Sequence, residues 1–271
     1  MTVAATTVDS ISGRRRRRRL GLLRHSLVLA RRSLAKTSRN PGAVINGVIT
    51  PAIFLVLFLY LFGGSVAGST RDYLQYLFPG ILVMGASLAG MLSTGVGIAV
   101  DMKKGVFDRF RSLPIGRTAP LLGSLLADMV RYLLGVAILF GLAYLLGFRV
   151  QTGLLSALGA VALAITFGFC LSWSTVLLAA TLRDESAVLA FSFIAFLPLQ
   201  LGTSLAAPTD TLPGWLRTWA EVNPVTHVID ASRALLTGTP MEGSLALSLT
   251  WSAVLLVTFC PLAALAYGRR Q

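Results

Sequence analysis

The sequence predicts an all-α membrane protein with six transmembrane helices and short helices in the segments that flank them. Of its 271 residues, 55% are hydrophobic and only 13% are charged, whereas a soluble domain carries about a quarter charged residues. The hydrophobic residues gather in six runs, each near or above the ~20 residues that cross a ~30 Å hydrocarbon core. We expect the spans at about 44–62, 79–100, 119–148, 154–182, 187–206 and 245–267.

The net charge of +13 is not that of a nucleic-acid-binding protein, because the basic residues stand in blocks beside the apolar runs. That distribution indicates anionic lipid and membrane topology. Cys170 and Cys260 fall inside apolar runs, with no CxxC and no nearby His, so we infer neither a disulfide nor a metal site. The basic N-terminus lacks an uninterrupted apolar core and a small-residue cleavage site, so we do not read it as a cleavable signal.

The N-terminal region is expected to comprise a disordered basic tail, residues 1–19, before a single transmembrane domain, residues 20–271. Arg14–Arg19 is a run of six arginines, which either fixes orientation alone or also binds the anionic inner leaflet. Over Leu20–Arg39, leucines fall in one sector and basic side chains beside it, which predicts an amphipathic helix in the plane of the membrane surface. Asn40–Gly42 ends this helix.

The apolar runs contain no Asp, Glu, Lys, Arg or His when the third is counted from Tyr132. Ion-coupled carriers usually need ionisable groups near the midplane, so this composition disfavours that class. Pro51, Pro198 and Pro261 predict kinks within the spans. Small residues recur every four positions in the second and fourth spans, a spacing that allows close helix packing. They are Ala86 and Gly90, Ser93 and Gly97, and Ala160, Ala164, Gly168 and Ser172.

Lys and Arg counts orient the predicted spans. Nineteen Lys and Arg residues lie on one side of the membrane, before the first span, in the second-to-third loop, in the fourth-to-fifth turn and in the C-terminal tail. Four lie on the opposite side. These four are Arg71, Arg149, Arg217 and Arg233. Arg131 follows Asp128 by three residues, and we expect the two to pair. The positive-inside rule then places both termini and the Asp101–Arg117 loop in the cytoplasm.

A polar island, Asp101–Arg117, separates the second and third spans. Four apolar residues recur along it at the spacing of one helix face: Val106, Phe107, Phe110 and Leu113. Pro114 ends that helix. The alternative is a solvated basic loop, but apolar surface in a short loop usually has a partner to cover it. We therefore interpret the island as the docking element through which another protein moves the membrane part.

Ala207–Ser244 is the longest segment on the opposite side. Trp215 and Trp219 are four residues apart and suit an interfacial aromatic belt. Asn223–Pro224 starts a new element, a short helix that ends at Gly238. Because this helix is too short and too charged to span, we expect it to lie in or dip into the outer interface.

Several catalytic motifs are absent from the sequence. There is no GxxxxGK[ST], no HExxH and no GxSxG, and Gly85–Gly90 has the wrong spacing for the last of these. His227 and Asp230 are three residues apart, but no nucleophile or metal ligand accompanies them, so we assign them a surface hydrogen-bonding role. The sequence therefore predicts a protein that is not an enzyme and draws its energy from elsewhere.

With these residues laid out, the chain resembles the membrane subunits of type-2 ABC exporters, particularly the daunorubicin-resistance branch, over nearly its whole length after residue 20. One marker is an acidic residue, a glycine, basic residues and Ser-Leu-Pro. It comprises Asp101, Gly105, Arg109, Arg111, Ser112, Leu113 and Pro114. A second is LPGWL…NPVTHVIDASRALLTG, from Leu212 to Gly238. The third is the amphipathic N-terminal helix with Arg39-Asn40-Pro41 leading into the first span.

The resemblance implies roles for two segments. In that family the loop after the second span is a cytoplasmic coupling helix that docks on the nucleotide-binding ATPase subunit. Its residues here are Asp101, Gly105, Val106, Phe107, Arg109, Phe110, Arg111 and Pro114. The segment before the sixth span forms short re-entrant outer helices, represented here by Trp215, Trp219, Asn223, Pro224, Arg233 and Gly238. Asp101 stands where glutamate is common in the family, which keeps the charge and shortens the side chain.

The same resemblance implies partners. The family's transmembrane domains work as pairs, so a homodimer with two ATPase subunits is implied, with ATP and Mg bound by the partner and no cofactor in this chain. No nucleic acid is expected among the partners. The alternatives are a non-transporting membrane scaffold or assembly protein, an exporter of a lipid-linked glycan, and the disfavoured ion-coupled carrier.

The side chains inside the spans also bear on the substrate. The polar groups well inside them are uncharged, as at Asn46, Thr166, Ser172 and Gln200. Such a pathway does not compensate the desolvation of a small ion or a sugar phosphate. We therefore expect a hydrophobic or amphiphilic drug, antibiotic or lipid that enters sideways from the inner leaflet.

Overall fold

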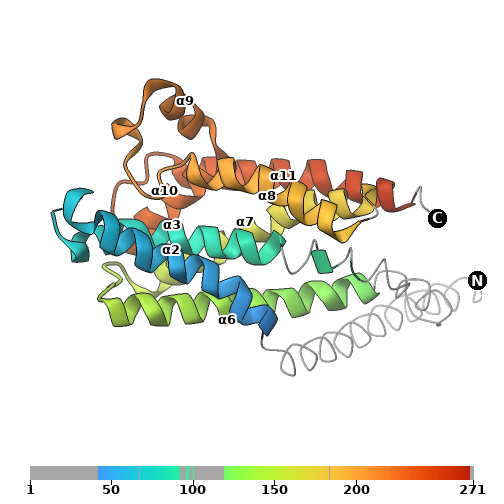
Figure 1. The fold of residues 1–271 in the computed structure, drawn as a ribbon, viewed down its shortest axis with the longest axis horizontal. Coiled ribbons are helices and arrows are strands. Elements are labelled where there is room, and N and C mark those ends of the chain that lie inside the picture. The colour runs from blue at the N-terminus through green and yellow to red at the C-terminus, as the bar shows by residue number, and fades with distance from the viewer. Residues whose placement is uncertain are drawn as a thin grey trace, which may run out of the picture.

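In the computed structural model the chain is a bundle of long helices that lie side by side (Figure 1). The structure describes residues 42–66, 68–91, 96–97, 100, 119–182 and 184–268. Within these residues it contains eight α-helices and no strand, which confirms the all-α fold. The predicted N-terminal amphipathic helix and the Asp101–Arg117 island lie outside the described residues.

In chain order the helices are α2 (Gly42–Val66), α3 (Thr70–Gly90), α6 (Ala119–Leu146), α7 (Leu154–Thr181), α8 (Glu185–Leu201), α9 (Gly214–Val222), α10 (Pro224–Thr237) and α11 (Ser244–Gly268). A 3-10 turn at Thr209–Thr211 lies between α8 and α9. Five of them, α2, α3, α6, α7 and α11, are long and apolar enough to cross a membrane. The sixth candidate, α8, is apolar but has 17 residues, fewer than the ~20 that a span ordinarily needs.

Helix α8 ends earlier than expected. The sequence predicts a fifth span that continues to Ala206, but the helix stops at Leu201 and the chain turns at Gly202. Residues 202–206 form turns in which Thr203 and Ser204 are buried. An apolar run does not reveal such a break, because the partners that accept the freed backbone groups come from distant parts of the chain.

Helix α3 begins earlier than expected. The apolar run starts at Pro79, but the helix starts at Thr70, and Pro79 lies inside it. The Ser69 side chain caps the helix by accepting a hydrogen bond from the Asp72 N–H at 3.1 Å, which satisfies one of the free donors of the first turn. The charged residues Arg71 and Asp72 interrupt the apolar pattern, so the first turns are hidden from a hydropathy reading.

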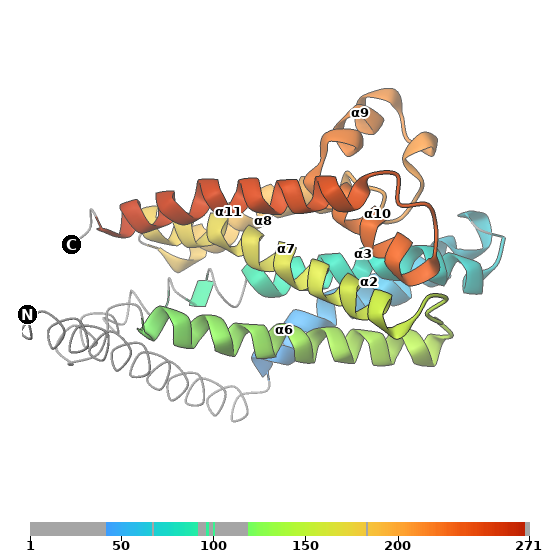
Figure 2. The same cartoon turned by 180° about the vertical axis from the view of Figure 1, so that it is seen from behind.

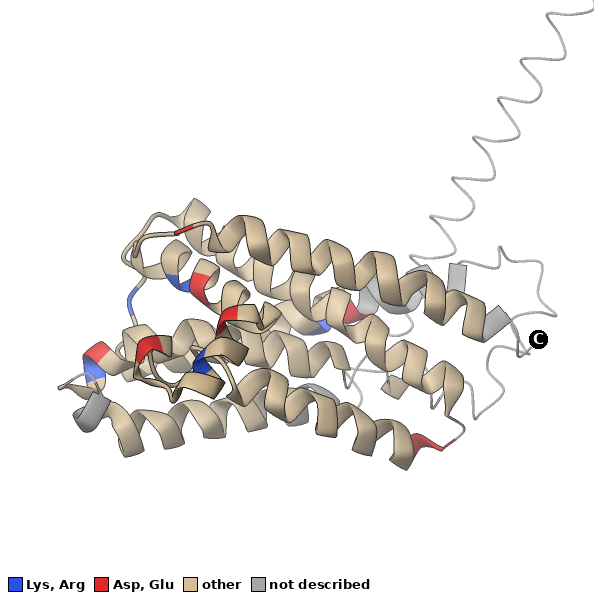
Figure 3. Cartoon of the chain, turned by 90° about the horizontal axis from the view of Figure 1, so that it is seen from above, with Lys and Arg blue, Asp and Glu red and all other residues tan. Residues whose placement is uncertain are grey.

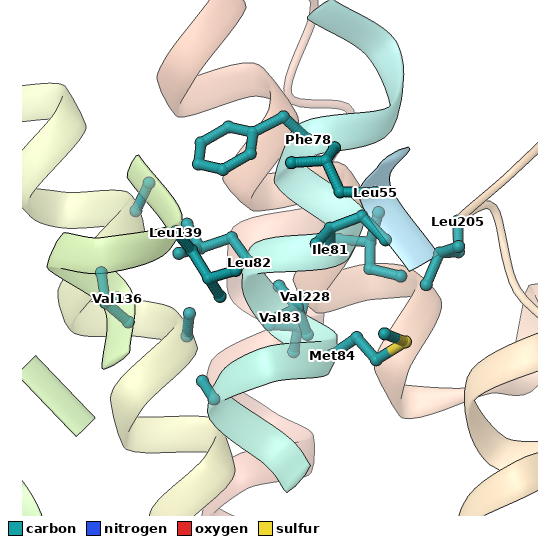
Figure 4. Packing of buried hydrophobic residues seen from close by; sticks show 14 of the residues in the cluster. Leu55, Phe78, Ile81, Leu82, Val83, Met84, Val136, Leu139, Leu205 and Val228 are labelled. Carbon is teal, nitrogen blue, oxygen red and sulfur yellow. The ribbon is translucent and has the colours of Figure 1, made fainter. Parts of the chain in front are cut away.

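Helix α3 is the centre of the bundle. It packs against α2, α6, α7 and α10, and most of its residues are buried. Figure 4 shows Ile81, Leu82 and Val83 of α3 surrounded by Leu55 of α2, Leu139 of α6 and Val228 of α10. Helix α7 crosses between α11 and α6 (Figure 2) and covers another side of α3.

The expected small-residue packing is confirmed for Ala86 and Gly90 of α3 and for Ala160, Ala164 and Gly168 of α7, and it lies within one chain. Gly97 has no atom within 4 Å of an added Cβ, and Ser93 lies outside the described residues. A Cβ added at Gly90 would collide with the carbonyl oxygen of Gly168, and a Cβ added at Gly168 would collide with that of Ala86. Ala160 and Ala164 on the same side of α7 are fully buried. The backbones of α3 and α7 therefore touch, which only side chains this small permit.

The two ends of the bundle differ. Helices α9 and α10 lie at one end, from which α11 runs to the other end of the bundle (Figures 1 and 2). Charged residues among those described concentrate around the first of these ends, which we call the α9–α10 end (Figure 3). Asp128 and Arg131 lie within α6, where Arg131 Nη1 donates to Asp128 Oδ1 at 2.7 Å, so the predicted pairing is confirmed.

Candidate functional site at the α9–α10 end of the bundle

Helix α10 has the start and the end that the sequence predicts. The Asn223 Oδ1 accepts a hydrogen bond from the Val225 N–H at 2.9 Å, and Pro224 opens the helix at a position that needs no N–H. Gly238 ends it with a φ of 76°, a left-handed conformation that favours glycine. Local sequence therefore determines where α10 lies along the chain.

Asn223 also reaches a second helix. Its Nδ2 donates to the Leu199 carbonyl at 2.9 Å and to the Gly202 carbonyl at 3.1 Å. The last carbonyls of a helix have no partner within that helix. One buried side chain therefore caps the start of α10 and satisfies the end of α8.

Arg233 is the buried charge of α10, with 9% of its surface exposed. Nη1 donates to Asp230 Oδ1 at 2.6 Å and Nη2 to the Ser204 carbonyl at 2.7 Å. Nε donates to the Tyr76 carbonyl at 3.2 Å, and the guanidinium carbon lies 3.9 Å from the centre of the Tyr76 ring. A guanidinium is tolerated in such a place only when its donors are satisfied, and here every nitrogen has an acceptor.

Arg233 contacts α3 next to a place where one backbone hydrogen bond of that helix is missing. Pro79 has no N–H, so the Gln75 carbonyl has no donor four residues ahead of it. Arg233 bonds the next carbonyl, that of Tyr76. The contact is therefore made where α3 departs from regular hydrogen bonding.

Two tyrosines of α3 hold the turn that follows α8. The Tyr73 hydroxyl donates to the Ala206 carbonyl and the Tyr76 hydroxyl to the Ser204 carbonyl, each at 2.8 Å. The Ser204 hydroxyl in turn donates to Asp230 Oδ1 at 2.7 Å. This set joins α3, α8 and α10, and we call it the polar junction. Its members are Tyr73, Tyr76, Ser204, Asn223, Asp230 and Arg233.

The far end of α10 is fastened as well. The Gln151 N–H donates to the Leu236 carbonyl at 3.0 Å, and the Thr152 hydroxyl donates to the Leu235 carbonyl at 2.5 Å. Both donors belong to the connection between α6 and α7. Helix α10 is thus held at its start, middle and end by three different parts of the chain.

Helix α9 projects from the side of the bundle (Figure 1). Trp215, Trp219 and Val222 follow one another on one of its faces and are 76%, 46% and 61% exposed. Elsewhere on the helix, Arg217 Nε donates to Glu221 Oε1 at 2.8 Å, and this hydrogen bond, with the charge of the carboxylate, raises the pKa of Arg217 above its ordinary value. A short helix with one aromatic and one charged face suits a boundary between water and lipid.

Trp219 connects α9 to the end of α8. A Cβ added at Gly202 would lie 2.6 Å from Cδ1 and Nε1 of the Trp219 ring, so the indole edge rests against the backbone there. Together with the Asn223 bonds to α8, this contact fixes α9 to the turn after Leu201.

The family model for ABC-2 type transporters matches residues 24–237. The chain belongs to the ABC-2 type transporter family. The match covers α2 to α10 and ends at the last residue of α10.

Individual relatives of this ABC-2 type transporter agree with the family. It is 36% identical to the daunorubicin resistance ABC transporter permease protein DrrB1 of Streptomyces coeruleorubidus, over 89% of this chain and 84% of that protein. It is 29% identical to the doxorubicin resistance ABC transporter permease protein DrrB of Mycobacterium tuberculosis, over 98% of this chain and 96% of that protein. It is 28% identical to the putative transport permease ycf38 of Cyanophora paradoxa, over 77% and 72%.

The structure of this ABC-2 type transporter places one of the two predicted segments. Asn223 and Arg233 belong to the polar junction, Pro224 and Gly238 bound α10, and Trp219 contacts Gly202, whereas Trp215 is exposed. The predicted coupling residues lie outside the described residues. They are Asp101, Gly105, Val106, Phe107, Arg109, Phe110, Arg111 and Pro114.

Asp230 makes hydrogen bonds to Ser204 and Arg233, as the sequence interpretation expects of a hydrogen-bonding residue. Sequence reasoning missed Tyr73, Tyr76 and Ser204. The tyrosines precede Pro79, where the predicted second span begins, and Ser204 falls inside the predicted fifth span, which continues to Ala206. Two tyrosines three residues apart, just before a proline, were a signal that they share one helix face.

Proposed function

We propose that this chain is the membrane-spanning permease subunit of an ATP-driven exporter and that it moves a hydrophobic or amphiphilic drug, antibiotic or lipid. The observation that carries the proposal is its likeness, over 89% of its length, to a permease named for daunorubicin resistance. The uncharged polar groups of the predicted spans support a substrate of the same kind, because they offer no compensation for a desolvated ion.

The energy comes from a separate subunit. The sequence has no P-loop, so ATP and Mg bind to a nucleotide-binding partner that docks on Asp101–Arg117. Two copies of this chain pair with two such ATPase subunits in a bacterial inner membrane, with both termini in the cytoplasm. The chain itself needs no cofactor.

The polar junction supports this assignment in a particular way. It holds the end of α8, the start and middle of α10 and the first two turns of α3 in one hydrogen-bonded unit, so a movement of α3 reaches α8 and α9 through short bonds and not through a flexible loop. We place this end of the bundle on the outer side of the membrane, where it controls release of the substrate. In that arrangement α8 is the fifth of six spans, and residues 202–206 complete its crossing.

The test is transport by the purified complex. The chain and its ATPase subunit are reconstituted in inverted vesicles, and ATP-dependent uptake of daunorubicin is measured by its fluorescence. Uptake that requires both subunits, and that stops when the P-loop lysine of the ATPase is replaced, supports the proposal. ATP hydrolysis that responds to a soluble hydrophilic solute and to no amphiphile would contradict it.

A further inference from the structure

Helix α9 has an exposed apolar face, which we call the aromatic face. Its members are Trp215, Trp219 and Val222, which are 76%, 46% and 61% exposed. The part of the chain that the structure describes leaves most of this face uncovered. Large apolar side chains that gather on one exposed surface usually mark a contact with something outside the chain.

Two other faces of α9 set the direction of the aromatic face. At ~100° per residue, Leu216 and Ala220 fall beside the aromatic face, whereas Arg217 and Glu221 fall nearly opposite to it. Ala220 is fully buried, so the helix rests on the bundle by its Leu216–Ala220 side. Arg217 Nε donates to Glu221 Oε1 at 2.8 Å, and both side chains are about half exposed, 53% and 55%. The aromatic face and the charged face therefore point in nearly opposite directions, and neither points into the bundle.

The aromatic face continues the apolar surface of α8. The indole edge of Trp219 rests against the backbone at Gly202, the residue that directly follows α8. Near that end α8 exposes apolar side chains, with Leu197 and Leu201 46% and 51% exposed. On a bundle of membrane-spanning helices such side chains face lipid tails, which are as apolar as leucine. Trp219 therefore lies at the edge of a lipid-facing surface.

Helix α9 also lies at the level where this apolar surface gives way to charge. In Figure 1 it stands at the side of the bundle, beside the end of α8 that leads to it. Figure 3 shows that charged residues concentrate at this end of the described chain. Tryptophan is enriched at this level of membrane proteins, because its indole has an apolar body and one N–H that needs a polar partner.

The size of the aromatic face favours lipid over a second protein as the partner. An aromatic side chain buries roughly 150–250 Å², so two half-exposed tryptophans and a valine offer a few hundred Å². A stable protein interface buries on the order of 1,000 Å² or more. A short helix with an apolar face of this size and a charged face opposite to it has the pattern of a helix that lies on a membrane surface.

We propose that α9 is a membrane-surface arm whose aromatic face inserts among the lipids of the leaflet at the α9–α10 end. The indoles lie where the headgroups meet the acyl chains, and the charged face stays in water. The inference goes beyond the proposed function and makes no assumption about the substrate. Because Trp219 and Asn223 attach α9 to the turn after α8, the arm also sets the depth of that turn in the bilayer.

The test measures the depth of single tryptophans in the full-length chain, reconstituted in phosphatidylcholine vesicles. The chain has four tryptophans, and replacing Trp173, Trp219 and Trp251 by Phe leaves Trp215 as the single reporter. Emission is compared in ordinary lipid, in lipid brominated near the headgroup end of the acyl chains and in lipid brominated near their far end. Iodide on both sides of the vesicle membrane reports contact with water. We expect Trp215 to lose most of its emission in the lipid brominated near the headgroup, less in the other brominated lipid, and little to iodide.

Two matched reporters calibrate this result, each placed in a chain whose own tryptophans are all replaced by Phe. Ile138→Trp lies near the middle of the spanning segment of α6, at a position that is 49% exposed, and bromine near the far end of the acyl chains should quench it most. Arg217→Trp lies on the charged face of α9, and iodide should quench it while bromine does not. Every variant must keep the Tm of the wild type. If Trp219→Phe unfolds the chain, the form that keeps both Trp215 and Trp219 reports on the same face.

Three other results would each overturn the inference. Quenching of Trp215 by iodide and not by brominated lipid would place the aromatic face in water. Protection from both quenchers would show that protein covers it, as in a contact with a second copy of the chain. Quenching like that of Ile138→Trp would place α9 in the hydrocarbon core. None of these results changes the exporter proposal, because the measurement needs neither the ATPase subunit nor a substrate.

Discussion

Arg233 holds Tyr76 in two ways at once: its Nε donates to the Tyr76 carbonyl at 3.2 Å, and its guanidinium carbon lies 3.9 Å from the centre of the Tyr76 ring. The first contact needs the directional donors of a guanidinium, and the second needs only a cation over the ring. Arg233 therefore joins α10 to the central helix α3. Replacing it by lysine would keep the positive charge but lose the planar, directional N–H donors of the guanidinium.

Replacing Arg233 should loosen the polar junction. Arg233→Gln removes the charge and most of the donors, and we expect a loss of about 2–3 kcal/mol of stability, because hydrogen bonds to charged groups are involved. Arg233→Lys should recover only part of it. Thermal unfolding of the purified permease measures both. The matched control is Arg217→Gln in the exposed pair with Glu221, which should leave the Tm unchanged, and an equal shift in the two glutamine variants would contradict this account.

Asn223 separates helix capping from the link between helices. Aspartate caps a helix as well as asparagine does, but it has no N–H to donate to the Leu199 and Gly202 carbonyls. Asn223→Asp should therefore destabilise the protein by at least ~1 kcal/mol, and Asn223→Ala, which loses the cap as well, by about 1 kcal/mol more. If Asn223→Asp has the Tm of the wild type, the bonds to α8 contribute nothing and only the cap matters.

The contact between α3 and α7 predicts opposite effects for two glycine substitutions. Gly168→Ala places a methyl group against the Ala86 carbonyl, and overpacking of this kind costs about 1–3 kcal/mol. Gly141→Ala in α6 has no atom within 4 Å, so it should stabilise the helix by up to ~1 kcal/mol. Urea or thermal unfolding compares them, and a stabilising Gly168→Ala would show that the two backbones are not in contact.

The Asp101–Arg117 segment should bind the ATPase subunit through its aromatic side chains. Burying one aromatic side chain contributes roughly 1.5–3 kcal/mol, so Phe110→Asp should abolish co-purification of the two subunits. Arg109→Ala should reduce substrate-stimulated ATP hydrolysis with a smaller loss of binding. Normal assembly and transport in Phe110→Asp would show that the segment is a solvated connector.

The proposed orientation can be checked with single cysteines. Cysteines at Ser69 and Thr209 should react with a membrane-impermeant maleimide added to intact cells, whereas a cysteine at Ser112 should react only after the cells are opened. Ser69 caps α3 and Thr209 lies in the segment before α9, both near the α9–α10 end. Labelling of Ser112 from outside would reverse the topology and remove the basis of the coupling prediction.

Much of this protein was determined by its sequence alone, because the deciding interactions are local. Apolar runs specified helices, since in lipid each backbone group must be satisfied within its own segment. Asn223, Pro224 and Gly238 specified the ends of α10, because capping depends on a few neighbouring residues. The motifs that carried the resemblance are likewise local, and they led to the family that the comparisons show.

The tertiary structure decided what the helices do to one another. Arg233 and the Tyr76 carbonyl are 157 residues apart in sequence, and nothing near either residue selects the other from many possible partners. The early end of α8 and the early start of α3 have the same origin, because the groups that satisfy a broken apolar run come from other helices. Close approach of Gly90 and Gly168 was suggested by small residues, but only the packed bundle identifies their partners, since shape complementarity is a property of two surfaces together.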